Sequence, residues 1–113
     1  MFQDKMVLCA SSAYEKKFYL NENFDGLHVK DELKIMCVLF TEDVGGVLSL
    51  EFDENGNLEL NTSADEGDLL YDEIGSVLKI KQMQQEKQEL FESLETYYKV
   101  FFFGEDLEDD NGD

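Results

Sequence analysis

The sequence predicts an α+β fold with N-terminal helices, an antiparallel β-hairpin that a third strand would extend, and a long or bent C-terminal helix. Two patterns carry this prediction. Apolar residues recur with helical spacing over residues 29–44 and again after residue 68. Between these segments, apolar residues alternate on both sides of an Asn-Gly pair, which is typical of a hairpin. The chain has 113 residues, of which 42% are hydrophobic, so residues 1–104 are expected to form one domain.

The N-terminal region is expected to hold a short strand followed by a short helix. Residues 6–10 form an apolar run that is compatible with a strand. Ser12 and Glu15 have the spacing of a capping box, which predicts a helix from this point to about Leu20. Residues 21–26 are rich in Asn, Asp and Gly, so we expect a loop there.

Residues 29–44 show the clearest helical pattern, and Gly45 is the expected end of the helix. Further apolar residues fall outside the main apolar face, so the later turns are apolar nearly all round and are expected to be deeply buried. A buried strand over residues 35–41 is the competing interpretation, because this stretch is rich in β-branched and aromatic residues. The residues on the main face are Val29, Leu33, Met36, Cys37, Phe40 and Val44.

The predicted hairpin comprises residues 47–52 and 58–60, where apolar and polar residues alternate. Read from Glu51, the turn also has the E-x-D-x-N-G pattern of a calcium-binding loop. The twelfth position of that loop is Thr62, which cannot supply the bidentate carboxylate that such a loop requires. We therefore predict a hairpin that carries no metal site.

A long helical segment is predicted from Asp68, the expected N-cap, to Gly104. One straight helix of this length would measure about 54 Å. A compact domain of this size is only about 34 Å across. Either the helix bends near residues 79–81, or its second half projects and buries its apolar side against another chain. Two apolar stripes lie on roughly opposite sides of it: Leu70, Ile74, Val77 and Leu78, and then Met83, Leu90, Leu94 and Phe101.

Five aromatic side chains within residues 97–103 cannot all face one core. They are covered either by the hairpin and helix of the same chain or by another chain, since aromatic residues are enriched at interface hot spots. The second alternative predicts a homodimer that is built around a two-fold axis. The residues expected to bind a partner are Leu90, Leu94, Tyr97, Tyr98, Phe101 and Phe102.

The net charge of −18 is the most unusual property of the composition. All nine basic residues are Lys, whereas nucleic-acid binding relies on clustered Lys and Arg. The composition therefore excludes a nucleic-acid-binding surface and docking on anionic membranes. Six of the acidic residues lie in residues 105–113, which are expected to form a disordered tail.

The few residues suited to catalysis or metal binding do not form a recognisable site. Cys9 and Cys37 lie in apolar runs and are expected to be reduced core residues, which points to the cytoplasm. His28 is the only histidine, and it has no nucleophile motif near it. No segment reaches the ~18 apolar residues of a membrane span, and none has the form of a signal peptide. We predict no catalytic residue, no cofactor and no metal.

Three strings resemble a known family: residues 40–53, which begin Phe-Thr-Glu-Asp-Val-Gly-Gly, residues 71–76 and residues 97–102. They are similar to an uncharacterised family of small acidic bacterial proteins. The resemblance covers most of the chain apart from the tail. It implies a bacterial cytoplasmic protein of unknown function and assigns no catalytic residues.

The function predicted from these observations is non-catalytic binding or regulation through protein–protein interaction. The acidic surface would meet a basic protein partner, and the chain would form a homodimer. One alternative is an acidic mimic of nucleic acid that inhibits a basic nucleic-acid-binding protein. A second alternative, less favoured, is an enzyme whose pocket is assembled from residues far apart in the sequence.

Overall fold

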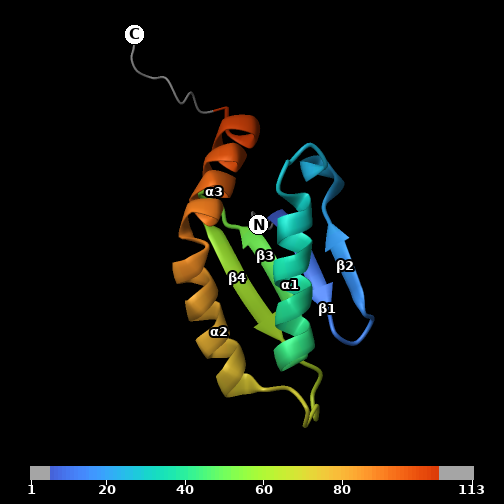
Figure 1. Ribbon diagram of the computed structural model, residues 1–113. Coiled ribbons are helices and arrows are strands. Elements are labelled where there is room, and N and C mark those ends of the chain that lie inside the picture. The colour runs from blue at the N-terminus through green and yellow to red at the C-terminus, as the bar shows by residue number, and fades with distance from the viewer. Residues whose placement is uncertain (1–5, 105–113) are drawn as a thin grey trace.

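The computed structural model describes residues 6–104 and shows an α+β fold of two layers (Figure 1). All strand pairs are antiparallel, and the strand order in the sheet is β2-β1-β3-β4. Helices α1, α2 and α3 lie on the same face of this sheet. The predicted tail, residues 105–113, lies outside the described residues. The elements are β1 (Met6–Ser12), β2 (Lys17–Leu20), α1 (Lys30–Val44), β3 (Val47–Phe52), β4 (Leu58–Ser63), α2 (Glu73–Glu86) and α3 (Gln88–Phe102).

The α+β class is confirmed, but the predicted helix at Ser12 is wrong. The Glu15 N–H does donate to the Ser12 hydroxyl, at 3.2 Å, as it would in a capping box. Lys16 then adopts φ +54°, which turns the chain back, and β2 pairs with the predicted strand β1. A helix this short is marginal in water, whereas strand pairing also packs Phe18 against the core. The chain therefore forms a hairpin here.

The helix predicted over residues 29–44 is confirmed as α1, and the strand alternative is wrong. Gly45 ends the helix with φ +86°, and its N–H donates to the Thr41 carbonyl at 2.9 Å. The predicted deep burial on all sides is wrong, because Ile35 and Leu39 are 60% and 58% exposed. The sheet covers one side of α1 and α2 lies along another, so these two residues remain on the open side.

The second hairpin is confirmed, and β4 extends it to Ser63. One Asp53 carboxylate oxygen accepts the backbone N–H groups of Asn55 and Asn57, both at 2.9 Å. The bond from Asn57 is the main reason why the pKa of Asp53 is lowered. Strand β3 also pairs with β1, so the sheet has four strands rather than the predicted two or three.

The C-terminal helical region is divided at Lys87, and the predicted bend at residues 79–81 is wrong. Lys87 has φ −111° and ψ 24°, which separates α2 from α3. The predicted N-cap, Asp68, is also wrong, because α2 begins later, at Glu73. Its N-cap is Asp72, whose carboxylate accepts the Gly75 N–H at 2.8 Å. Figure 1 shows α2 and α3 as one column beside β4 with a change of direction between them.

An aromatic cluster fixes α3 to the sheet. Phe24 belongs to a short 3₁₀ turn, Glu22–Phe24, and its ring centroid lies 5.7 Å from that of Phe52. Tyr98 of α3 stacks on Phe52 with parallel ring planes and a centroid distance of 4.2 Å. Burial is the main cause of the raised pKa of Tyr98. Tyr98 is therefore part of the core of this chain.

Both cysteines should be unreactive in the folded chain. Cys9 on β1 and Cys37 on α1 are free and fully buried, with their sulfur atoms 4.0 Å apart. Their mutual hydrogen bond and burial raise the pKa of Cys9, and the thiolate is the reactive form. A thiol reagent should label neither residue in the native chain and both after denaturation. Cys9→Ser, as a control, should lower the denatured count by one thiol, and rapid native labelling would contradict the burial.

Candidate protein-binding surface

The three most exposed large apolar residues of the described chain lie at the start of α2 and in the loop before it, and two further exposed ones follow on α2. The exposed fraction is 95% for Leu69 and 91% for Leu70. On α2 it is 77% for Ile74, 53% for Val77 and 62% for Leu78. Scattered apolar residues are normal on a protein surface, but a group of neighbouring ones marks an interaction site. We call these five residues the α2 apolar surface.

The orientation of α2 explains why this stripe faces outward. Ser76 is buried, and its hydroxyl lies 2.9 Å from that of Tyr71. Ile80 and Met83 continue the same side of the helix and pack against the core. Helical geometry then places Ile74 and Leu78 on the opposite side. In the first turns of α2, the side chain that faces inward is thus the small, polar Ser76. The larger apolar side chains of Ile74, Val77 and Leu78 face solvent.

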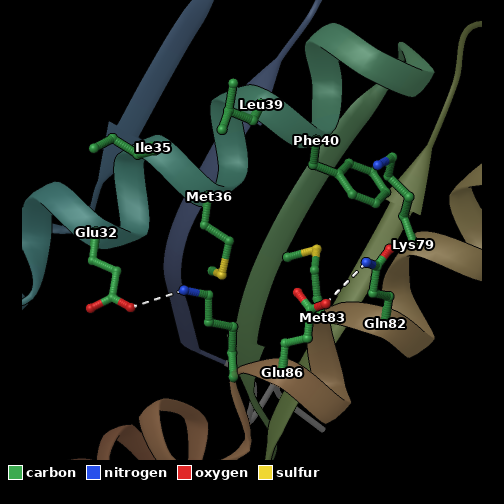
Figure 2. A pocket seen from close by; sticks show the side chains of 10 residues that line it. Glu32, Ile35, Met36, Leu39, Phe40, Lys79, Gln82, Met83 and Glu86 are labelled. Atoms are coloured by element: carbon green, nitrogen blue, oxygen red, sulfur yellow. Dashed lines mark hydrogen bonds and ion pairs between the residues drawn. The ribbon is translucent and has the colours of Figure 1, made fainter.

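A groove of about 510 Å³ runs between α1 and α2 (Figure 2). Met36 and Phe40 point from α1 toward α2, and Met83 points back toward them. Ile35 and Leu39 line the groove and extend away from α2. Lys79 lines the groove and directly follows Leu78 in the chain, so the groove comes within one residue of the α2 apolar surface, although none of those five residues lines it.

Two ion pairs join the helices on either side of this groove. Lys79 lies 2.8 Å from Asp43, and Lys87 lies 3.2 Å from Glu32 (the latter pair is drawn in Figure 2). These pairs are partly exposed, so each contributes only about 0–1 kcal/mol to stability. They show that α1 and α2 run antiparallel. Glu86 also lines the groove, and its carboxylate accepts a hydrogen bond from Gln82.

The residues predicted to bind a partner are divided by the structure into buried and exposed groups. Leu94 and Tyr98 are 3% and 5% exposed and belong to the core. Leu90 and Tyr97 are partly buried against it. Phe101 and Phe102 remain 68% and 36% exposed near the end of α3, although Phe102 also stacks on Phe24 and Tyr98. The stripe expected to need a second chain is thus largely covered within this one.

None of the five residues of the α2 apolar surface is among those predicted to bind a partner, and neither are Ile35 and Leu39. A signal existed for Ile35 and Leu39, since both lie outside the main apolar face of the helix that contains them. Such a surplus of apolar residues fits burial on all sides of a helix as well as an exposed binding surface. For Leu69 the sequence contains no comparable signal.

The residues considered for chemistry are not brought together. His28 is exposed in the turn before α1, whereas Cys9 and Cys37 are buried between β1 and α1. Within residues 6–104, no group of three His, Cys, Asp or Glu side chains is placed to hold a metal ion. In the same range, no helix has both the length and the apolar character to cross a membrane.

The comparisons with known proteins give a family but no activity. Neither a curated protein nor a solved structure matches the chain. A family described as "Family of unknown function (DUF6145)" matches residues 5–106, which is nearly the whole chain. This chain therefore belongs to the DUF6145 family of unknown function.

Proposed function

We propose that this chain is a non-catalytic protein that binds a partner protein through the α2 apolar surface and the adjoining α1–α2 groove. The observation that supports this most directly is the 62–95% exposure of Leu78, Ile74, Leu70 and Leu69. Covering one such side chain fully is worth roughly 1.5–3 kcal/mol. A partner that covers several of them gains enough free energy to bind stably.

The occupant we propose is a basic, amphipathic helix of another protein. Apolar side chains on one face of such a helix would fill the groove beside Ile35 and Leu39 and extend over Leu78 at its edge. Glu32 and Asp43 are paired with Lys87 and Lys79, so Glu86 is the carboxylate of the groove without a lysine partner in the described residues. With a net charge of −18, the chain attracts basic partners and repels a second copy of itself. We place the protein in the bacterial cytoplasm, on the resemblance and on the two reduced thiols.

A synthetic amphipathic helix of Leu and Lys with one Trp tests this proposal, because the chain itself has no Trp and the peptide fluorescence can be followed alone. We expect saturable binding that remains in about 0.5 M salt, where charge attraction is screened beyond a few ångströms. The double variant Ile74→Glu/Leu78→Glu should weaken binding at least about tenfold, the equivalent of 1.4 kcal/mol. Both residues are exposed, so the variant should stay folded by circular dichroism.

Phe101→Glu is the matched control, because it places the same charge on an exposed apolar residue of α3. It should leave peptide binding unchanged. Loss of binding in this variant alone would move the interface to the end of α3. Peptide binding that is lost at about 0.5 M salt and is unaffected by Ile74→Glu/Leu78→Glu would instead favour the nucleic-acid mimic.

Sedimentation equilibrium should show that the chain is a monomer. If it shows a dimer that Leu78→Glu dissociates, the occupant of the surface is a second copy of this chain.

A further inference from the structure

We propose that a second site, on the other side of α1 from the groove, binds a small organic anion. A cleft of about 890 Å³ lies between the β1–β2 turn, the second half of α1 and the loop before α2. This volume is in the range of small-molecule sites. Apolar side chains of Phe18 and Val38 form part of its wall, so the cleft can hold a nonpolar body as well as a charged group.

The distribution of lysines indicates the charge of the ligand. Lys16, Lys17 and Lys34 all line the cleft. None of them has an ion pair within residues 6–104, although the chain carries 27 acidic residues. Three ammonium groups around one cavity repel one another, and an anion placed among them removes that repulsion. Lysine binds phosphate and carboxylate groups as a compact positive charge.

The acidic side chains of the cleft do not neutralise these lysines. Asp43 pairs with Lys79 of α2. Asp68 accepts hydrogen bonds from the Tyr14 hydroxyl and the Leu70 N–H. The donors to Asp68 are uncharged, and the bond from Tyr14 is the main reason why the pKa of Asp68 is lowered, so this carboxylate stays ionised. Asp68 and Glu42 together therefore oppose three ammonium groups, which leaves an excess of one positive charge at the cleft.

The turn that carries Lys16 also places a hydrogen-bond donor at the cleft. Lys16 is the one non-glycine residue with positive φ within the described range, and this conformation closes the β1–β2 hairpin. Ser12 precedes this turn, and its oxygen accepts the Glu15 N–H. No acceptor for the Ser12 hydroxyl proton is found in residues 6–104, which leaves a donor at the cleft for an anionic oxygen.

Phenyl phosphate is a suitable probe, because it joins a dianion to an apolar ring. NMR titration should show saturable amide shifts that are confined to residues 11–18, 34–46 and 68–70, which line the cleft. Each exposed lysine should contribute about two- to fivefold to affinity, so the triple variant Lys16→Gln/Lys17→Gln/Lys34→Gln should bind at least about tenfold more weakly. Benzyl alcohol, which has the ring without the charge, should not bind.

Lys81→Gln is the matched control, because Lys81 is exposed on α2, also lacks an ion pair in the described residues and lies away from the cleft. It should change the affinity by less than about twofold, within the range of a remote surface substitution. Equal weakening by the control would mean that only net charge matters and would overturn the proposal. Absence of saturable binding up to about 10 mM, well above a millimolar Kd, would overturn it as well.

Discussion

Leu94→Glu should unfold the chain and should not simply release a partner. Leu94 is 3% exposed and belongs to the core that α3 shares with the sheet. Truncating a buried Leu to Ala already costs about 2–5 kcal/mol. A glutamate in the same place must also bury a charge or take up a proton. Domains of this size are stable by only about 5–15 kcal/mol, so we expect loss of the cooperative urea transition.

Two controls separate this effect from a general sensitivity of α3. Phe101→Glu changes an exposed residue of the same helix and should alter the free energy of unfolding by less than about 0.5 kcal/mol. Leu94→Met keeps the volume and should cost less than about 1.5 kcal/mol. If Leu94→Glu instead gives a folded monomer while the unsubstituted chain is a dimer, the homodimer contact predicted from the sequence would be correct.

The elements that could be predicted from the sequence are those whose signals are local. Helix α1 follows from apolar spacing within one segment and from Gly45 at its end. The β3–β4 hairpin follows from the alternation of apolar and polar residues around a turn. In that turn the Asp53 carboxylate accepts the backbone N–H groups of Asn55 and Asn57. In both cases the contacts that decide the conformation lie within a few residues of one another.

The β1–β2 hairpin could not be predicted because a local signal favours a helix at Ser12, whereas the contacts that favour strands come from residues far along the chain. The bond from Glu15 to Ser12 that suggested a helix is present in the structure. The opposing contribution comes from β3, far along the chain, which pairs with β1 from Phe52 to Val47. A sequence pattern gives the local bond directly and gives no information about the distant partner.

The break at Lys87 has a similar origin, since no Gly or Pro marks it. Helix α2 packs against the core through Ile80 and Met83. Helix α3 is held at the β3–β4 turn, where the Glu95 carboxylate accepts the Leu58 N–H at 2.8 Å. The two halves are thus attached to different parts of the fold, and the chain changes direction between them at Lys87.

The two apolar stripes of the C-terminal region were visible in the sequence, but their roles were not. The stripe with Leu94 lies inside because Tyr98, on the next turn, stacks on Phe52. The stripe with Leu78 lies outside because Ser76 and Met83 occupy the inward side of α2. Which stripe is covered depends on the tertiary contacts of its neighbours.

Gly46→Ala should be the most damaging glycine substitution in the described part of the chain. A Cβ at Gly46 would lie 2.5 Å from the Ser63 carbonyl oxygen and 2.8 Å from a ring carbon of Tyr71. Its φ of +71° adds a conformational cost of about 1–2 kcal/mol for any other residue. Overpacking typically costs about 1–3 kcal/mol more. We expect a total loss of about 2–5 kcal/mol in a urea unfolding experiment.

Gly67→Ala is the matched control, because Gly67 has φ +84° and nothing within 4 Å of an added Cβ. It should show the conformational cost alone, so the difference between the two variants measures the clash. Relief of that clash would move Tyr71, and the neighbouring Asp72 N–H donates to the Val44 carbonyl at 2.9 Å. The start of α2 should therefore shift, and binding of the Leu-Lys peptide should weaken in Gly46→Ala but not in Gly67→Ala. Equal stability losses with equal peptide binding would show that the contact between Gly46 and Tyr71 does not position the α2 apolar surface.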